Sequence, residues 1–314
     1  MTFFASAVHQ QPGGMRGPAL LEQLLAHPDA VPGAVNLDGC GLAELPAVIG
    51  GRLDLQRLSA YDNALENLPD WLWNLRDLRV LNLSANRLTA LPAGLGELKR
   101  LEMLDLGHNA LAELPDSVGG LRDLRFVYLS NNRLTRLPES LRHLQALNYL
   151  NVTDNPLGEL PQWLGNLSSL QELRAYNTAL TVLPASVGDL PALRELHLMN
   201  NDLTTLPQEL TQCSGLRELD LQNNALTSLP ESVGRLRALT RLNLRFNELS
   251  GLPDSLAELS ELRFLDLRAN RLTALPEELA ALPRLEKLDL RWNSLTTLPA
   301  AFERLRARGC LIHL

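Results

Sequence analysis

The chain has 314 residues, enough for two ordinary globular domains or for one elongated repeat array. Its formal net charge of -7 excludes a general attraction to nucleic acid or anionic membranes, and its three cysteines are too few and too scattered for a disulfide framework or a zinc site. Aromatic residues make up 4% of the chain while leucine is very frequent, which indicates internal repetition.

The first 31 residues are expected to form a flexible N-terminus followed by a helical cap. Residues 1–16 contain the sequence QQPGG and should be flexible, although Phe3 and Phe4 could contact a ligand. Between Pro18 and Pro28 four leucines have helical spacing, which predicts a helix over 18–28 that covers the start of the repeats. These leucines are Leu20, Leu21, Leu24 and Leu25.

Localisation follows from what the sequence lacks. The N-terminus has neither the basic start nor the apolar run of a secretory signal, and no stretch reaches about 18 continuous apolar residues. Together with the isolated cysteines, this predicts a cytoplasmic protein in a reducing compartment. The strong preference for arginine over lysine, which occurs only at Lys99 and Lys287, is typical of a GC-rich bacterial genome.

Residues 32–307 consist of twelve repeats of 23 residues without an insertion or deletion. In every repeat the fourteenth place is leucine and the fifteenth is proline, from Leu45 and Pro46 to Leu298 and Pro299. Asparagine occupies the ninth place in ten of the repeats, and the exceptions are Cys40 and Thr178. A partial thirteenth repeat is expected at 308–314, with a last strand around Leu311 after the charged helical segment 303–308.

The pattern LxxLxLxxNxL, followed by a shorter variable stretch, resembles the leucine-rich repeat family. The 23-residue form with LPxxLxxL is similar to the intracellular class of Ras-group scaffold proteins and of many bacterial proteins. The resemblance covers residues 32–307. It implies an α/β solenoid, a curved array with a concave parallel β-sheet and short helical or 3-10 segments on the convex side, and it implies a binding surface rather than one particular activity.

Elementary stereochemistry supports the same architecture. In the segment VLNL, alternation turns Leu81 and Leu83 inward and leaves Val80 and Asn82 outside, so each repeat supplies one short strand that must stack on its neighbours in parallel. A ninth-place asparagine can donate to and accept from backbone groups at the turn. Thr178 is a weaker partner, and we expect a local irregularity there.

Proline at the fifteenth place suits the first turn of a helix and not its interior, so about one or two turns should follow it. Pairs such as Leu95 with Leu98, and Val118 with Leu121, are the expected buried side chains of these segments. Because such segments are thinner than full helices, the array should bend into a shallow arc.

The candidate binding site is the concave face, formed by the third and fifth places of each strand and by the seventh and eighth places just beyond it. In repeats five and six this face is aromatic, and two more large side chains follow at the adjoining rim positions of repeats seven and eight. Such side chains favour a protein partner, although mutual stacking is an alternative. These candidates are Phe126, Tyr128, Tyr149, Tyr176 and Met199.

Three successive third places are glutamates, which repel one another at strand spacing. There are three alternatives for these glutamates: their pKa values are raised, they pair with Arg174 and His197, or they bind a basic partner. The glutamates are Glu172, Glu195 and Glu218. Farther along, the face becomes basic and aromatic, and Asp220, Asp266 and Asp289 could neutralise part of it. The candidates there are Arg241, Arg245, Phe246, Phe264, Arg268, Lys287, Arg291 and Trp292.

Nothing in the sequence predicts catalysis, a cofactor or a metal. The motifs GxxxxGK[ST], GxGxxG, HExxH and GxSxG are absent, and His108 and His197 would lie four strand spacings, roughly 19 Å, apart. Cys213 replaces a buried leucine and is interpreted as a core residue. The sequence predicts a non-catalytic module that binds a protein on its concave face. No binding to nucleic acid or to a membrane is expected, and the default oligomeric state is a monomer.

Two other functions stay open at this level. One is a bacterial secreted effector, or a toxin-associated protein, whose repeats recognise a host target. The other is a regulator of a phosphatase or small GTPase, which only the Ras-group resemblance implies.

Overall fold

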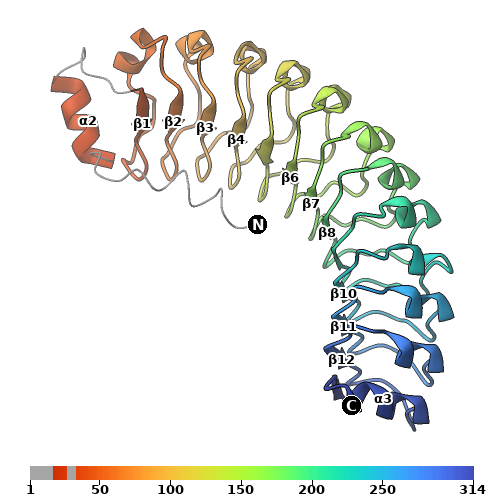
Figure 1. The fold of residues 1–314 in the computed structure, drawn as a ribbon. Coiled ribbons are helices and arrows are strands. Elements are labelled where there is room, and N and C mark those ends of the chain that lie inside the picture. The colour runs from red at the N-terminus through yellow and green to blue at the C-terminus, as the bar shows by residue number, and fades with distance from the viewer. Residues whose placement is uncertain (1–16, 27–32) are drawn as a thin grey trace.

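The computed structural model describes residues 17–26 and 33–314, which form an open arc of stacked repeats (Figure 1). Within these residues the repeats build one parallel sheet of thirteen strands in the order of the chain. The expectations for residues 1–16 and for Pro28 lie outside the described part. The strands are β1 (Ala34–Asn36), β2 (Arg57–Ser59), β3 (Val80–Asn82), β4 (Met103–Asp105), β5 (Phe126–Tyr128), β6 (Tyr149–Asn151), β7 (Glu172–Arg174), β8 (Glu195–His197), β9 (Glu218–Asp220), β10 (Arg241–Asn243), β11 (Phe264–Asp266), β12 (Lys287–Asp289) and β13 (Leu311–His313).

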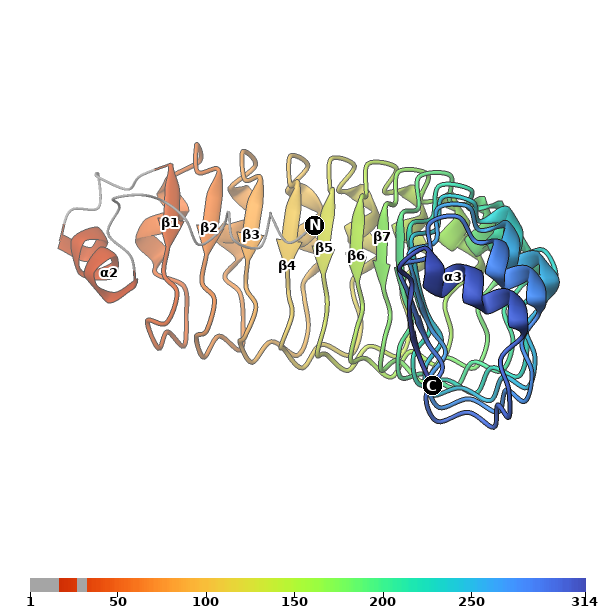
Figure 2. The same cartoon turned by 60° about the horizontal axis from the view of Figure 1, so that its bottom comes forward.

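The sheet lines the inner side of the arc, and the helical segments lie outside it (Figures 1 and 2). Most of these segments are 3-10 helices, which confirms the short convex segments expected from the sequence. They are η2 (Ala47–Gly51), η3 (Asp70–Asn74), η4 (Ala93–Glu97), η5 (Asp116–Gly120), η6 (Glu139–His143), η7 (Gln162–Asn166), η8 (Ala185–Asp189), η9 (Gln208–Gln212), η10 (Val233–Arg235), η11 (Asp254–Glu258), η12 (Glu277–Ala281) and η13 (Ala300–Phe302). The α-helices are α2 (Gly17–Ala26) and α3 (Glu303–Ala307).

Strand register follows the repeat. Leu81 pairs with Leu104, its equivalent one repeat later, and both are buried. The last step differs, because Lys287 pairs with Leu311. That step spans 24 residues, so α3 adds one residue, and a thirteenth repeat that starts at 308 is one residue out of register.

The buried leucines form one continuous core along the arc. Leu81 and Leu83 are fully buried, as are Leu98 and Leu121 behind their 3-10 segments, so the predicted inward places are confirmed. At the start of the array, α2 contributes Leu20 and Leu24 to the same core. Leu25, the last of the four leucines of this helix, is 62% exposed because it lies on the outer face of α2.

The ninth-place asparagines form a hydrogen-bond ladder between repeats. In a typical unit, Asn86 Nδ2 donates to the backbone oxygens of Ala60 and Leu83, while its Oδ1 accepts from the amide of Leu65. Each asparagine thus satisfies backbone groups of its own repeat and of the repeat before it, which is the predicted role.

Thr178 interrupts this ladder, as expected. The amide of Leu157 bonds to the oxygen of Asn155 instead of a side chain in the next repeat, and Gly158 and Ala179 take left-handed backbone conformations. The strand register on either side is unchanged. The irregularity is therefore confined to the turn beside the sheet.

Candidate functional site

The concave wall consists of the third- and fifth-place side chains of β5 to β12, and the rim consists of the seventh- and eighth-place side chains that follow each strand. Strand alternation points the wall residues away from the core while the leucines between them are buried. Figure 2 shows β1 to β7 side by side in the sheet, of which β5 to β7 belong to this wall. All the sequence-predicted site residues lie on the wall or the rim, but they divide into groups with different contacts.

The aromatic group stacks internally. The rings of Tyr128 and Tyr149 have centroids 4.8 Å apart at an interplanar angle of 37°, and the Arg174 guanidinium lies 5.8 Å from the Tyr149 ring centroid. Burial raises the pKa of Tyr128 to about 12 and also raises that of Tyr149. Phe126 pairs with Tyr149 across the strands and is half-buried. Mutual stacking, the alternative reading, thus accounts for the two tyrosines.

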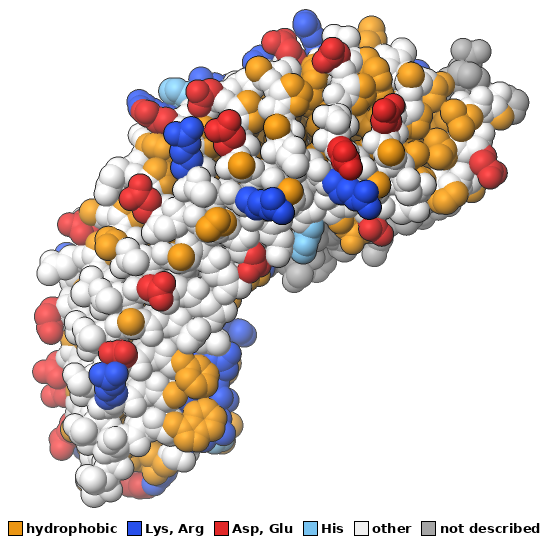
Figure 3. All heavy atoms as spheres, turned by 180° about the vertical axis from the view of Figure 1, so that it is seen from behind, with side chains coloured by type: hydrophobic (Ala, Val, Ile, Leu, Met, Phe, Trp, Pro, Cys, Tyr) orange, Lys and Arg blue, Asp and Glu red, His pale blue; other side chains and the backbone are white. Residues whose placement is uncertain are grey.

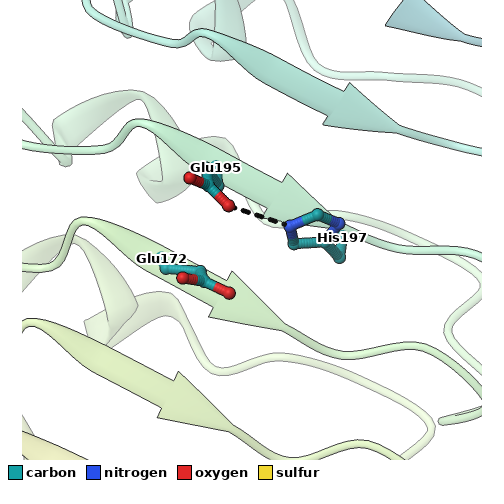
Figure 4. A group of neighbouring side chains, drawn as sticks. All are labelled: Glu172, Glu195 and His197. Carbon is teal, nitrogen blue, oxygen red and sulfur yellow. Dashed lines mark hydrogen bonds and ion pairs between the residues drawn. The ribbon is translucent and has the colours of Figure 1, made fainter. Parts of the chain in front are cut away.

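Two of the three glutamates are paired within the wall. Glu172 accepts a hydrogen bond from Arg174 Nε at 2.6 Å, and Glu195 lies 3.5 Å from His197 Nε2 (Figure 4). Among the described residues Glu218 has no ion-pair partner. The hydrogen bond with His197 holds the pKa of Glu195 below its ordinary value, although burial acts in the opposite direction, so a raised pKa is wrong for this residue.

The oxygens of Glu172 and Glu195 and a nitrogen of His197 lie within 4.8 Å of one another. The sequence pattern predicts pairing among these residues but does not indicate a cluster of all three. Two carboxylates and an imidazole are ligands that a divalent cation accepts. Arg174, however, already neutralises Glu172, so the arrangement is that of an ion-pair network.

The His197–Glu195 pair predicts a measurable titration. Replacing His197 with alanine should raise the pKa of the Glu195 carboxyl, because the stabilising hydrogen bond is lost. With the pair intact, Glu195 contributes stability above its unfolded pKa of about 4.3, and this contribution disappears as the pH falls through the lower folded value. Carbon-detected NMR of the Glu195 carboxyl measures its pKa in the original chain and in the His197→Ala variant. The same pKa in both would show that the pair does not form.

The basic end of the wall is largely neutralised. Arg268 donates to both oxygens of Asp266, and Arg291 donates to both oxygens of Asp289, as the sequence predicted in part. The Asp289 side chain is only 1% exposed and also lies 3.8 Å from Lys287 Nζ. Burial raises the pKa of Asp289, but the bond from Arg291 and the charges of the arginines outweigh it and leave the pKa below its ordinary value.

A pocket of about 290 Å³ lies on the wall over β9 to β12. Its floor is formed by strand leucines, and the Arg241 guanidinium stacks 5.0 Å from the Phe264 ring centroid at its side. The charged and polar residues that line it are Glu218, Asp220, Arg241, Asn243, Asp266, Lys287 and Asp289. Neither Glu218 nor Asp220 is ion-paired within the described residues, so the β9 side of the pocket is acidic.

The rim has a constraint that the sequence reasoning missed. The eighth place of every full repeat has a positive φ, from Gly39 at 65° to Trp292 at 61°. Asparagine, aspartate and glycine tolerate this conformation and fill seven of the twelve places, a recurrence that could have revealed it. The fifth-place side chains brace the same turn, as when Asn82 Oδ1 accepts from the amide of Ser84.

Phe246 and Trp292 occupy this left-handed place and are 45% and 65% exposed. Their ring centroids lie 6.4 Å apart at an interplanar angle of 28°. Figure 3 shows apolar side chains beside basic ones on the C-terminal limb of the arc. The two rings belong to repeats that are separated by one other repeat, and the eighth place of that repeat is the small residue Ala269.

Cys213 is buried in the core, as predicted. Its thiol lies 3.1 Å from the backbone oxygen of Val187, and burial raises its pKa to about 11, so it is not a nucleophile at neutral pH. Within residues 17–26 and 33–314, no helix combines the length and apolar character that crossing a bilayer requires.

Comparison with solved structures places the chain among curved repeat proteins. A leucine-rich repeat protein of Leptospira interrogans is 26% identical, with a TM-score of 0.60 and coverage of 94% of this chain and 98% of that one. A plant peptide hormone receptor, RGFR1 in complex with RGF2, is 27% identical, with a TM-score of 0.66 and coverage of 83% and 52%. PEPR1 in its structure with AtPEP1 is 32% identical, with a TM-score of 0.67 and coverage of 83% and 42%, so the chain spans about half or less of either receptor.

No curated protein matches the sequence. A family model described as leucine-rich repeat region matches residues 53–155, and models described as leucine rich repeat match 146–167, 214–272 and 260–307. These matches together cover about two thirds of the chain and coincide with the strands and turns described above. The chain therefore belongs to the leucine-rich repeat family.

Proposed function

We propose that this chain is a non-catalytic, cytoplasmic module that binds a protein partner on its concave wall, chiefly over β9 to β12. The observation that carries this proposal is the pocket on that part of the wall, because its polar lining is not needed for the core. Farther toward β5, Tyr128, Tyr149, Glu172 and Glu195 already contact one another or their neighbours. A partner therefore gains the most binding free energy at the pocket over β9 to β12.

The chemistry of the pocket suits a protein segment. Arg241 stacked on Phe264 is the kind of arginine and aromatic pair that dominates binding energies at protein interfaces, and Glu218 offers a carboxylate for a basic group. The structures of RGFR1 with RGF2 and of PEPR1 with AtPEP1 support the choice of a protein or peptide ligand for this fold.

The test is a pair of matched variants. Replacing both Arg241 and Phe264 with alanine should lower the affinity for a partner isolated by pull-down by about tenfold or more, because truncating such anchors costs over 1 kcal/mol of binding free energy. Arg57 has the same place in β2, far along the arc, and its replacement with alanine should leave the affinity unchanged. Equal affinities for the double variant and the original chain, with both folded by circular dichroism, would move the site elsewhere.

A further inference from the structure

The proposed function leaves open what kind of segment the partner presents, and the rim beside the pocket bears on this question. Phe246 and Trp292 are bulky residues in a left-handed backbone conformation, which is unfavourable for side chains other than Gly, Asn and Asp. Trp292 is also 65% exposed, so burial in the folded chain does not compensate for this cost. The repeat imposes this backbone conformation at every eighth place, and seven of the twelve places hold Gly, Asn or Asp. The turn therefore does not require an exposed aromatic side chain there, and exposed aromatic residues are typical of binding surfaces.

The two rings act as one surface. They belong to repeats ten and twelve, and their near-parallel stacking spans Ala269, whose methyl group leaves room between them. The Arg291 guanidinium lies 5.7 Å from the Trp292 ring centroid and is fixed by two hydrogen bonds to Asp289. This ring pair is therefore a supported apolar platform open to solvent.

The basic group next to the platform differs from its neighbours in one respect. Arg268 and Arg291 each bond to the aspartate two residues earlier, at the fifth place of the repeat. The equivalent residue for Arg245 is Asn243, which carries no charge.

As a consequence, Arg245 has no carboxylate partner among the described residues. One guanidinium nitrogen donates to Gln222 Oε1, a neutral acceptor, and Nε is buried without a hydrogen-bond partner in the described part of the chain. The Arg245 charge is therefore not neutralised within the described part of the chain, so a carboxylate that reaches the guanidinium supplies the counter-ion and a charge-assisted hydrogen bond that Gln222 cannot.

We propose that this rim site recognises a protein segment in which an acidic side chain is adjacent to a flat apolar one, such as an aromatic residue or proline. The carboxylate bonds to Arg245, and the apolar side chain lies on Phe246 and Trp292. This inference rests on the proposed function, since the rim borders the pocket of the wall, and it adds the chemical identity of the partner's contact residues.

The experiment is selection of a random peptide library displayed on phage against the full chain. Enriched peptides should carry Asp or Glu within one or two residues of Trp, Tyr, Phe or Pro. A synthetic enriched peptide should then bind at least about tenfold more weakly to Trp292→Asn and to Arg245→Gln. Tyr61→Ala, a seventh-place aromatic in the second repeat, should bind it as the original chain does.

Two of these variants separate binding from structure. Trp292→Asn places a residue that tolerates the left-handed region, so it should lose binding while its melting temperature stays equal or rises. Asn243→Asp gives Arg245 the same kind of intramolecular partner that Arg268 and Arg291 have. It should therefore lower the affinity for the acidic peptide without removing any contact residue.

Enriched peptides without an acidic residue, or peptides insensitive to Trp292→Asn and Asn243→Asp, would overturn the rim site. If such peptides nevertheless lose affinity in the Arg241 and Phe264 double variant, the proposed function stands and only the rim assignment fails. If no peptide is enriched above an unrelated control protein, both the rim site and the peptide-binding wall are contradicted.

Discussion

Replacing Asn155 with alanine is expected to lower the free energy of unfolding by about 3 to 5 kcal/mol. Its side chain is 1% exposed, donates to the oxygens of Leu129 and Val152, and accepts from the amide of Leu134. Alanine leaves these buried backbone groups without partners, and each such group costs roughly 1–3 kcal/mol. Urea denaturation followed by circular dichroism measures the change.

A surface asparagine serves as the control. Asn74 is exposed at the end of η3, and its side chain makes no hydrogen bond within the described residues, so Asn74→Ala should change the unfolding free energy by less than about 0.5 kcal/mol. If both variants unfold at the same urea concentration, the asparagine ladder does not stabilise the array.

The second large effect concerns the convex side. A Cβ atom added at Gly188 in η8 would lie 2.3 Å from the backbone oxygen of Glu209 in the next repeat. Because backbone rather than a flexible side chain must move, Gly188→Ala should destabilise the chain by about 1–3 kcal/mol. Thermal unfolding monitored by calorimetry gives the size of the effect.

Gly51 in η2 is the matched position without a neighbour, since nothing lies within 4 Å of its added Cβ. Gly51→Ala should be neutral or should stabilise the chain by up to about 1 kcal/mol through the unfolded state. A Gly188 variant as stable as the Gly51 variant would mean that the 3-10 segments are less closely packed than described.

Much of the fold could be predicted because its constraints recur. A leucine at the fourth or sixth place meets the same leucines in every repeat, so Leu81 reports the environment of all its equivalents. The ninth-place asparagines satisfy the same backbone groups in each repeat. The replacement of one of them by Thr178 therefore predicted an irregular turn at that repeat. Leu25 and the 24-residue last step could not be inferred, because both depend on how single terminal helices dock.

The site was less accessible to sequence reasoning because its contacts do not recur. The wall residues were identified by place, but whether Glu172 pairs with Arg174 or awaits a partner depends on side-chain geometry. The sequence has Asn243 where the two later repeats have aspartate, but only the structure shows that Arg268 and Arg291 bond to those aspartates while Arg245 bonds to Gln222. The left-handed conformation at Trp292 could have been inferred from the Asn, Asp and Gly residues at the other eighth places, but the stacking of its ring on Phe246 could not.

The central claim is that the open part of the concave wall holds a protein partner. Photo-crosslinking tests it most directly, with benzoylphenylalanine in place of Phe264 on the wall and, separately, in place of Val182, which is 64% exposed away from the wall and the rim. In a lysate of the cells that produce the chain, we expect a crosslinked protein from position 264 that is absent from position 182. A partner that crosslinks at position 182 and not at position 264 would contradict the account.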